Sequence, residues 1–336
     1  MIRFAAAALL LLAMTFGIAA PAAAQPNIMT PFNAPGTVDT NAKRVEGIPF
    51  GDGERFKLDL YLPDPPALGA PVVMFIYGGG WKNGNRGDYE FVGRALASRG
   101  FIAVVPDYRL YPEVRYPDFL YDGARAAKWV EDNIASYGGD PQRFFLAGHS
   151  AGAYNAVMLA LDKSFFRELG VTLPVRAVAG ISGPYDFYPF EYDEVRNSFG
   201  DAPNPEGTQP VNLVTADAPP MLLLQGVTDF IVRVQNTEHL AERLRSQNVW
   251  VTEKYFENIG HMEPVFAMGA LWRWRLPVLE EVTQFFARFG AFPSGAPRPN
   301  YIPDPPQTFD IAGGGTPQPI DDVVRQMEDM FAPLSN

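Results

Sequence analysis

A serine stands between two glycines in the run Gly148-His149-Ser150-Ala151-Gly152. This run follows the apolar stretch 144–147 and precedes a helix-like segment at 154–161. Where a strand turns sharply into a helix, glycines relieve crowding of the backbone, and the turn lifts the serine hydroxyl clear of the sheet. The N-terminus of the helix then faces any developing negative charge. The pattern predicts that Ser150 is a nucleophile, although a turn of small residues without chemistry has the same pattern.

A serine hydroxyl is a weak nucleophile at neutral pH, so it needs a base within hydrogen-bond reach and a carboxylate that orients the base. The chain has three histidines. His149 is next to the serine on a tight turn, where its side chain should point away from the hydroxyl. His239 falls in the polar helix-like run 235–248, which predicts a solvated position. His261 follows the strand-like run 249–256 and is the predicted base; capping of the next helix is the alternative.

Asp229 is the predicted orienting carboxylate. It follows the apolar run 220–225 and the short segment Gly226-Val227-Thr228, which indicates a loop at the end of a buried strand. An ordinary turn aspartate is the alternative for this position. Three other aspartates could take the role, and the first of them follows the strand-like run 177–182: Asp186, Asp201 and Asp217.

Tetrahedral chemistry also needs hydrogen-bond donors for an oxyanion, and Tyr77-Gly78-Gly79-Gly80-Trp81 follows the strand-like run 71–76. Consecutive glycines let the backbone approach a substrate and aim amide N–H groups at it. We therefore predict an oxyanion hole made by the amides of Gly79, Gly80 and Ala151. The alternative, a phosphate-binding loop, lacks the Gly-Lys-Ser/Thr that would follow it.

These motifs together resemble the α/β-hydrolase superfamily, in the branch of carboxylesterases and lipases that is similar to hormone-sensitive lipase and to bacterial feruloyl-esterase-like proteins. The resemblance covers residues 55–290 and is carried by Tyr77 to Trp81, Asp107-Tyr108-Arg109-Leu110, Gly148 to Gly152, Gly226 to Asp229 and Gly260-His261. The chain order serine, aspartate, histidine is also that of the superfamily. One position departs from the family pattern, because its oxyanion loop usually opens with histidine and this chain has Tyr77. In the family that histidine mostly supports the loop and does not react, so the difference concerns the geometry of the loop more than the hydrolysis.

Strand-like apolar runs alternate with helix-like segments from residue 56 to residue 289, which predicts an α/β fold with a doubly wound, mostly parallel sheet and flanking helices. Residues 56–62 are predicted to form an edge strand. The predicted organisation is a signal peptide at 1–24, an irregular segment at 25–45, an α/β-hydrolase domain at 46–292 with a lid-like insertion at 183–219, and a Pro/Gly-rich tail at 293–336. Within the tail, 320–331 could form a short amphipathic helix or a disordered end.

The N-terminus has the three parts of a secretory signal peptide: Met1-Ile2-Arg3, the apolar run 4–20 and the small-residue end Pro21-Ala22-Ala23-Ala24. Cleavage near Gln25 would give an exported protein, periplasmic or secreted, with no stable membrane insertion. A retained membrane anchor is the alternative. The chain has no cysteine, which excludes disulfides, a thiolate nucleophile and a zinc site built on sulfur.

The formal net charge is -11, which argues against nucleic acid or anionic lipid as a partner. Hydrophobic residues make up 47% of the chain, enough for a packed globular domain. The predicted chemistry uses no metal and no organic cofactor, and the oligomeric state is left open.

Aromatic residues predict where a substrate would bind. Loop 183–219 carries several of them, and others flank the oxyanion loop and His261; the predicted lining residues are Trp81, Phe187, Tyr188, Phe266 and Trp272. They would suit a small, neutral, moderately apolar ester, unless they belong to the core. Arg109 and Asp107 are predicted to form a structural hydrogen-bonded pair.

The predicted function is that of an exported carboxylesterase that works through an acyl-enzyme intermediate. Two other functions fit the same residues. The chain could hydrolyse amides, as arylformamidases or exopeptidases of this fold do, or it could be a catalytically silent, hydrolase-like binding protein.

Overall fold

The computed structural model describes residues 27–290. The predicted signal peptide, 1–24, and the predicted tail, 293–336, with its possible helix at 320–331, lie outside these residues. No helix within residues 27–290 has the length and the apolar character needed to cross a membrane.

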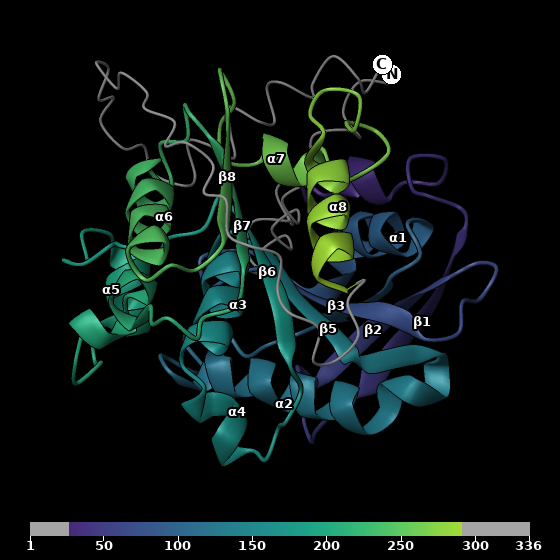
Figure 1. Ribbon diagram of the computed structural model, residues 1–336, viewed down its shortest axis with the longest axis horizontal. Helices are drawn as coiled ribbons and strands as arrows, with labels where there is room; N and C mark the ends of the chain where they lie inside the picture. The colour runs from purple at the N-terminus through teal and green to yellow at the C-terminus, as the bar shows by residue number, and fades with distance from the viewer. Residues whose placement is uncertain (1–26, 291–336) are drawn as a thin grey trace, which may run out of the picture.

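An eight-stranded sheet crosses the middle of the molecule in the order β1-β2-β4-β3-β5-β6-β7-β8 (Figure 1). β1 pairs antiparallel with β2, and β2 with β4, whereas all other neighbours are parallel. The predicted doubly wound, mostly parallel sheet is therefore confirmed. The strands are β1 (Ala42–Pro49), β2 (Lys57–Pro63), β3 (Ala70–Ile76), β4 (Ile102–Pro106), β5 (Gly139–His149), β6 (Val175–Ile181), β7 (Met221–Gly226) and β8 (Val251–Phe256).

Helices cover both faces of the sheet (Figure 1). On one face α1 and α8 contact each other, and on the other α2 packs on α3, which lies against β5 and β6. The α-helices are α1 (Glu90–Ser98), α2 (Asp118–Asn133), α3 (Ala151–Leu161), α4 (Ser164–Glu168), α5 (Asp193–Phe199), α6 (Gln235–Ser246), α7 (Glu263–Phe266) and α8 (Val278–Gly290). Short 3-10 turns are η1 (Thr30–Asn33), η2 (Arg86–Tyr89), η3 (Ile134–Tyr137), η4 (Glu206–Thr208) and η5 (Pro210–Leu213).

The central strands are apolar on both faces because helices cover both faces. Every residue of β4 and of β7 is buried. In α3 all eleven residues are buried, so this helix shows no polar face. The strand-turn-helix unit β5-Ser150-α3 thus lies in the centre of the core, which fixes the position of its turn.

The structure differs from the predictions at the N-terminal side. Residues 57–63 form β2, which is the second strand of the sheet, because the unpredicted strand β1 pairs along its outer side. The segment before β1 also contributes to the core: Phe32 is fully buried, and its ring stacks on Phe266 at 4.1 Å. The predicted lid-like segment, 183–219, contains α5, η4 and η5.

Candidate active site

The predicted reacting residues meet at the carboxyl edge of the sheet, where loops of parallel strands converge. Ser150 directly follows β5, and the glycine loop 77–81 directly follows β3, the neighbour of β5. Asp229 lies in the loop after β7, and His261 lies in the loop after β8.

Ser150 occupies a strained turn. Its backbone has φ 54° and ψ -125°, a region that non-glycine residues rarely adopt. The two flanking glycines permit the turn, because a Cβ on Gly148 would lie 2.3 Å from the Gly152 carbonyl oxygen, and a Cβ on Gly152 would lie 2.0 Å from the Ile76 carbonyl oxygen. The spacing of the motif therefore reflects backbone crowding between β3, β5 and α3.

Ser150, His261 and Asp229 form a continuous line of hydrogen bonds. Ser150 Oγ is 2.9 Å from His261 Nε2, and His261 Nδ1 is 2.8 Å from Asp229 Oδ2. The Asp229 side chain has no exposed surface and that of His261 is 7% exposed. In this geometry Nδ1 donates to the carboxylate, which leaves Nε2 free to accept the serine proton.

Three further donors hold the Asp229 carboxylate. The amides of Ile231 and Val232 donate to Oδ1 at 3.0 and 2.8 Å, and Gln225 Nε2 donates to Oδ2 at 3.0 Å. Gln225 itself is fixed, because its side chain also donates to the Val232 carbonyl and accepts from Thr237 Oγ1. The orientation of Asp229 is therefore set by its own loop and by Gln225 near the end of β7.

The glycine loop after β3 lines the same cavity as Ser150. Gly79 has φ 128° and Gly80 has φ 60°, and a Cβ on Gly79 would lie 2.2 Å from the Asn83 carbonyl oxygen. Within residues 27–290, the amides of Gly79, Gly80 and Ala151 donate to no backbone carbonyl. All three residues line the cavity that contains Ser150, as the predicted oxyanion hole requires.

Tyr77, which stands where the family pattern has histidine, supports this loop from behind. It is fully buried, its hydroxyl lies 3.1 Å from Asp107 Oδ1, and its carbonyl oxygen accepts from Tyr108 Oη at 3.0 Å.

The predicted pair of Arg109 with Asp107 is wrong. Arg109 instead binds the buried carboxylate of Asp122 on α2 through Nε and Nη2 at 2.9 and 2.8 Å, whereas Asp107 binds Arg86.

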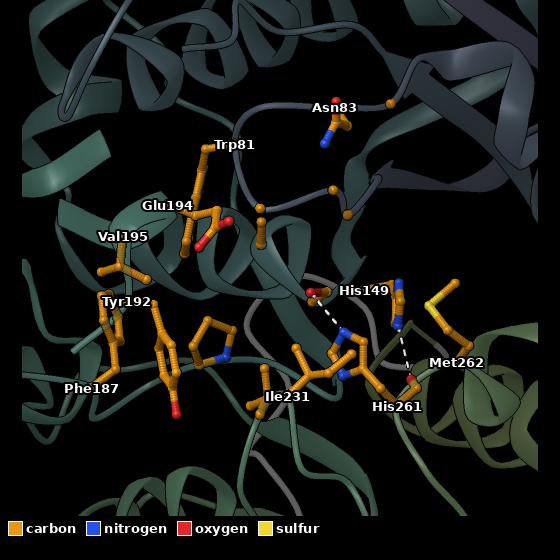
Figure 2. Close-up of a pocket in the computed structure, with 18 of the residues that line it drawn as sticks. Trp81, Asn83, His149, Phe187, Tyr192, Glu194, Val195, Ile231, His261 and Met262 are labelled. Atoms are coloured by element: carbon orange, nitrogen blue, oxygen red, sulfur yellow. Dashed lines mark hydrogen bonds between the residues drawn. The ribbon is translucent and has the colours of Figure 1, made fainter. Parts of the chain in front are cut away.

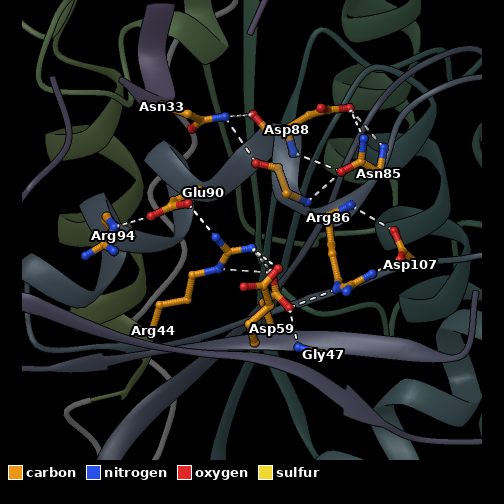
Figure 3. A network of polar contacts seen from close by, with 12 residues as sticks. Asn33, Arg44, Gly47, Asp59, Asn85, Arg86, Asp88, Glu90, Arg94 and Asp107 are labelled. Atoms are coloured by element: carbon orange, nitrogen blue, oxygen red, sulfur yellow. Dashed lines mark hydrogen bonds and ion pairs between the residues drawn. The ribbon is translucent and has the colours of Figure 1, made fainter. Parts of the chain in front are cut away.

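A buried charge network anchors the same region (Figure 3). Arg86 on η2 binds Asp107 and also donates from Nε to Asp59 Oδ1 at 2.8 Å. Asp59 on β2 is fully buried and also binds Arg44 of β1 at 2.7 Å. The network therefore connects the start of the sheet to the segment that follows the glycine loop.

A cavity of about 680 Å³ opens beside Ser150 and His261, a size that is usual for a small-molecule site. Figure 2 shows Trp81, Phe187, Tyr192 and Val195 gathered on one side of it, with Glu194 nearby. Ile231 and Met262 approach from the loops after β7 and β8. Tyr188 also lines the cavity and is 46% exposed.

Two residues predicted to line this cavity lie elsewhere. Phe266 on α7 is buried against Phe32, and Trp272 packs edge-on against both rings. The segment before β1 fills the space that these side chains face, and the sequence gives no sign of that contact. Neither Phe266 nor Trp272 is among the described residues that line the cavity.

The alternative histidine and aspartates have other partners. His239 is exposed on α6, as predicted, and its Nδ1 lies 2.6 Å from Asp186 Oδ2. Asp201 pairs with Arg115, and Asp217 pairs with Lys163. Within residues 27–290 no three His, Cys, Asp or Glu side chains are grouped as a metal site requires.

Gln225 and Tyr89 were not predicted from the sequence. Both contact residues of the site, but neither takes part in the proposed reaction. Gln225 is the last side chain before Gly226 on a strand that is otherwise apolar, so its isolated polarity was a usable signal. Tyr89 Oη lies 3.2 Å from His149 Nδ1, a contact across 60 residues that no local pattern announces.

The model of the BD-FAE family matches residues 58–244. Esterase LipQ of Mycobacterium tuberculosis is 31% identical over 274 residues, which are 75% of this chain and 64% of that protein. Esterase LipC of the same organism is 32% identical over 219 residues, 59% of this chain and 54% of that protein. The probable isoprenylcysteine alpha-carbonyl methylesterase ICME of Oryza sativa subsp. japonica is 34% identical over 147 residues, 42% of this chain and 36% of that protein. The chain thus spans about a third to two thirds of these relatives.

Solved esterase structures share the fold. A truncated carbohydrate esterase from gut microbiota superposes with a TM-score of 0.67 at 20% identity, covering 76% of this chain and 98% of that chain. Esterase B from Lactobacillus rhamnosis gives a TM-score of 0.66 at 22% identity, covering 76% of this chain and 87% of that one.

Proposed function

The chain belongs to the BD-FAE family, and from that premise we propose that it is a serine hydrolase that cleaves carboxylic esters. The observation that carries the proposal is the 2.9 Å contact between Ser150 Oγ and His261 Nε2, beside available amides and inside a cavity. The names of its relatives, which are esterases, support the same reaction class.

In the proposed reaction, Ser150 Oγ attacks the ester carbonyl carbon while His261 Nε2 takes the hydroxyl proton. The carbonyl oxygen becomes an oxyanion that accepts hydrogen bonds from the amides of Gly79, Gly80 and Ala151. His261 returns the proton to the leaving alcohol as the ester bond breaks, which leaves an acyl group on Ser150. Water, deprotonated by His261, then releases the acid and restores the serine. Asp229 holds the imidazole in the required tautomer throughout.

The cavity favours an ester with a moderately apolar acyl or aryl group. Trp81, Phe187 and Tyr192 form an aromatic wall, and the Trp81 ring is itself fixed by a hydrogen bond from Nε1 to Asn155 Oδ1 at 3.1 Å. A rigid aromatic wall binds apolar groups without losing much side-chain entropy.

The reaction class is tested with p-nitrophenyl esters of increasing acyl length beside p-nitroanilides of the same acids. We expect ester turnover with kcat/KM at least about 100-fold above that of the anilides, because an anilide is the poorer leaving group. Equal or greater turnover of the anilides would favour the amide hydrolase instead. A folded protein that binds these esters without turnover would favour a binding role.

Phe187→Ala tests the proposed acyl pocket. We expect the preferred acyl chain to lengthen, because the truncation enlarges the cavity beside Trp81. Trp274→Ala is the control, since Trp274 is 80% exposed and does not line the cavity. An unchanged chain-length profile in Phe187→Ala would show that this aromatic wall does not contact the acyl group.

We also propose that the chain is exported after cleavage near Gln25, on the strength of the N-terminal sequence pattern. The N-terminal residue of the protein recovered from the periplasm or the culture medium tests this. A protein that keeps residues 1–24 and sediments with membranes would instead support the retained anchor.

A further inference from the structure

Three segments of the site are joined by a line of buried hydrogen bonds that bypasses Ser150. The Gly78 amide donates to Tyr89 Oη at 3.3 Å, and Tyr89 Oη lies 3.2 Å from His149 Nδ1. His149 Nε2 lies 3.1 Å from the carbonyl oxygen of His261. Figure 2 shows this last contact, with the His149 ring directed at the main chain of His261.

The direction of every hydrogen bond in this series follows from the group at its end, the carbonyl oxygen of His261. The His261 carbonyl oxygen can only accept, so His149 Nε2 carries the proton and donates it. His149 Nδ1 is then an acceptor, and the Tyr89 hydroxyl donates to it. The Tyr89 oxygen in turn accepts from the Gly78 amide. Every donor in this series therefore has an acceptor when His149 is neutral. Burial keeps His149 neutral by lowering its pKa well below the usual value.

The parts joined in this way are distant in the fold. Gly78 lies after β3 and His149 ends β5, but His261 follows β8, and both β6 and β7 separate β8 from β5. Tyr89 and His149 are 3% and 1% exposed. The Tyr89 ring is held between Tyr77 and Phe91, whose centroids are 5.9 and 6.0 Å away. The line therefore consists of side chains that have little freedom to move.

We propose that Tyr89 and His149 are positioning residues for the ester hydrolysis proposed above, on which this inference rests. They fix the distance between the glycine loop, at Gly78, and the main chain of His261. The oxyanion donors and the imidazole then reach the same reacting carbonyl together. Such alignment matters because a misplacement of about 1 Å can cost about 100-fold in rate.

Tyr89→Phe removes one oxygen and both of its hydrogen bonds. We expect kcat to fall about tenfold or more while KM changes less than about twofold, because the groups that bind substrate remain. The rate at which a fluorophosphonate labels Ser150 should fall with kcat. The matched control is Tyr61→Phe, since Tyr61 is fully buried and its hydroxyl has no hydrogen-bond partner within the described chain.

Replacements of His149 test the other half of the line. His149→Gln keeps an amide N–H that can reach the His261 carbonyl, whereas His149→Leu keeps none. We expect the Gln variant to retain most of its kcat and the Leu variant to lose at least as much as Tyr89→Phe. Because the two residues act as one unit, the double variant Tyr89→Phe/His149→Leu should be no slower than the slower single variant.

Several results would overturn the inference: wild-type kcat in both Tyr89→Phe and His149→Leu, an equal loss in Tyr61→Phe, or losses that multiply in the double variant. A loss of kcat that simply follows a lowered melting temperature would also overturn it, because that is the effect of general destabilisation. Absence of ester turnover in the unaltered protein would contradict the proposed function instead, and the labelling rates of Ser150 would still decide the role of Tyr89 and His149.

Discussion

His149 is an ionisable side chain that the fold keeps uncharged. It is buried beside His261, and both its burial and any charge on His261 lower the pKa of His149 well below the ordinary 6.5. In the unfolded chain the same side chain takes up a proton near pH 6.5. The contribution of His149 to stability is therefore complete above about pH 6.5 and is lost as the pH falls below it.

This predicts a pH-dependent stability that depends on one residue. Below pH 6.5 the free energy of unfolding should fall by up to about 1.4 kcal/mol per pH unit through His149, and His149→Gln should lack that share. Urea unfolding of both proteins at pH 7 and at pH 5 measures the difference. An identical pH dependence in the variant would show that His149 is not a neutral buried group in the native state.

The residues of the proposed triad were predictable as neighbours because each follows a strand in a local pattern of glycines and polar side chains. Tyr89, and the true partner of Arg109, were not, because both depend on contacts between distant segments. Phe266 and Trp272 were misplaced for the same reason. Their sequence positions close to His261 are compatible with a pocket wall, and only the fold brings Phe32 against them.

At the scale of elements, the network in Figure 3 adds side-chain contacts to the backbone pairing that joins β1 and β2 to the rest of the sheet. Asp59 and Asp107 have side chains that are 0% and 5% exposed, and Arg86 binds both. A buried carboxylate that loses its partner is costly, because the charge is not solvated again. The antiparallel strand β1 was not predicted from its sequence, since its mixed polar and apolar residues become a strand only through pairing with β2.

Arg86→Met should therefore destabilise the protein by about 3 kcal/mol. Arg99→Met is the matched control, because Arg99 pairs with Glu280 at the surface, where both side chains are more than a third exposed, and should cost less than about 1 kcal/mol. Denaturant unfolding compares the two. Equal costs at both positions would mean that the buried network does not hold the first strands.

At the scale of the whole molecule, the negative charge of the chain extends into the cavity. The described lining includes Asp88, Asp186, Glu191 and Glu194 but one basic side chain, Arg233. Within residues 27–290 the Glu194 carboxylate makes no hydrogen bond or ion pair, and Figure 2 shows it beside the aromatic wall. Esters with a negative charge should be poor substrates, because they meet like charge in a partly enclosed space.

Glu194→Gln should raise the ratio of kcat/KM for p-nitrophenyl hemisuccinate to kcat/KM for p-nitrophenyl butyrate about fivefold, which corresponds to about 1 kcal/mol. Asp193→Asn removes the same charge from the neighbouring residue of α5, which pairs with Arg196 and does not line the cavity, and should leave the ratio unchanged. An equal change of the ratio in both variants would mean that net charge alone, and not the position of Glu194, sets the preference for uncharged esters.

The proposed nucleophile is tested by the reaction of the purified protein with a fluorophosphonate, read by mass spectrometry, beside ester turnover by Ser150→Ala. We expect one adduct, located on Ser150, and a fall in turnover of at least about 10⁴-fold in the folded variant. An adduct on another residue, or turnover by Ser150→Ala at the unaltered rate, would contradict the proposal.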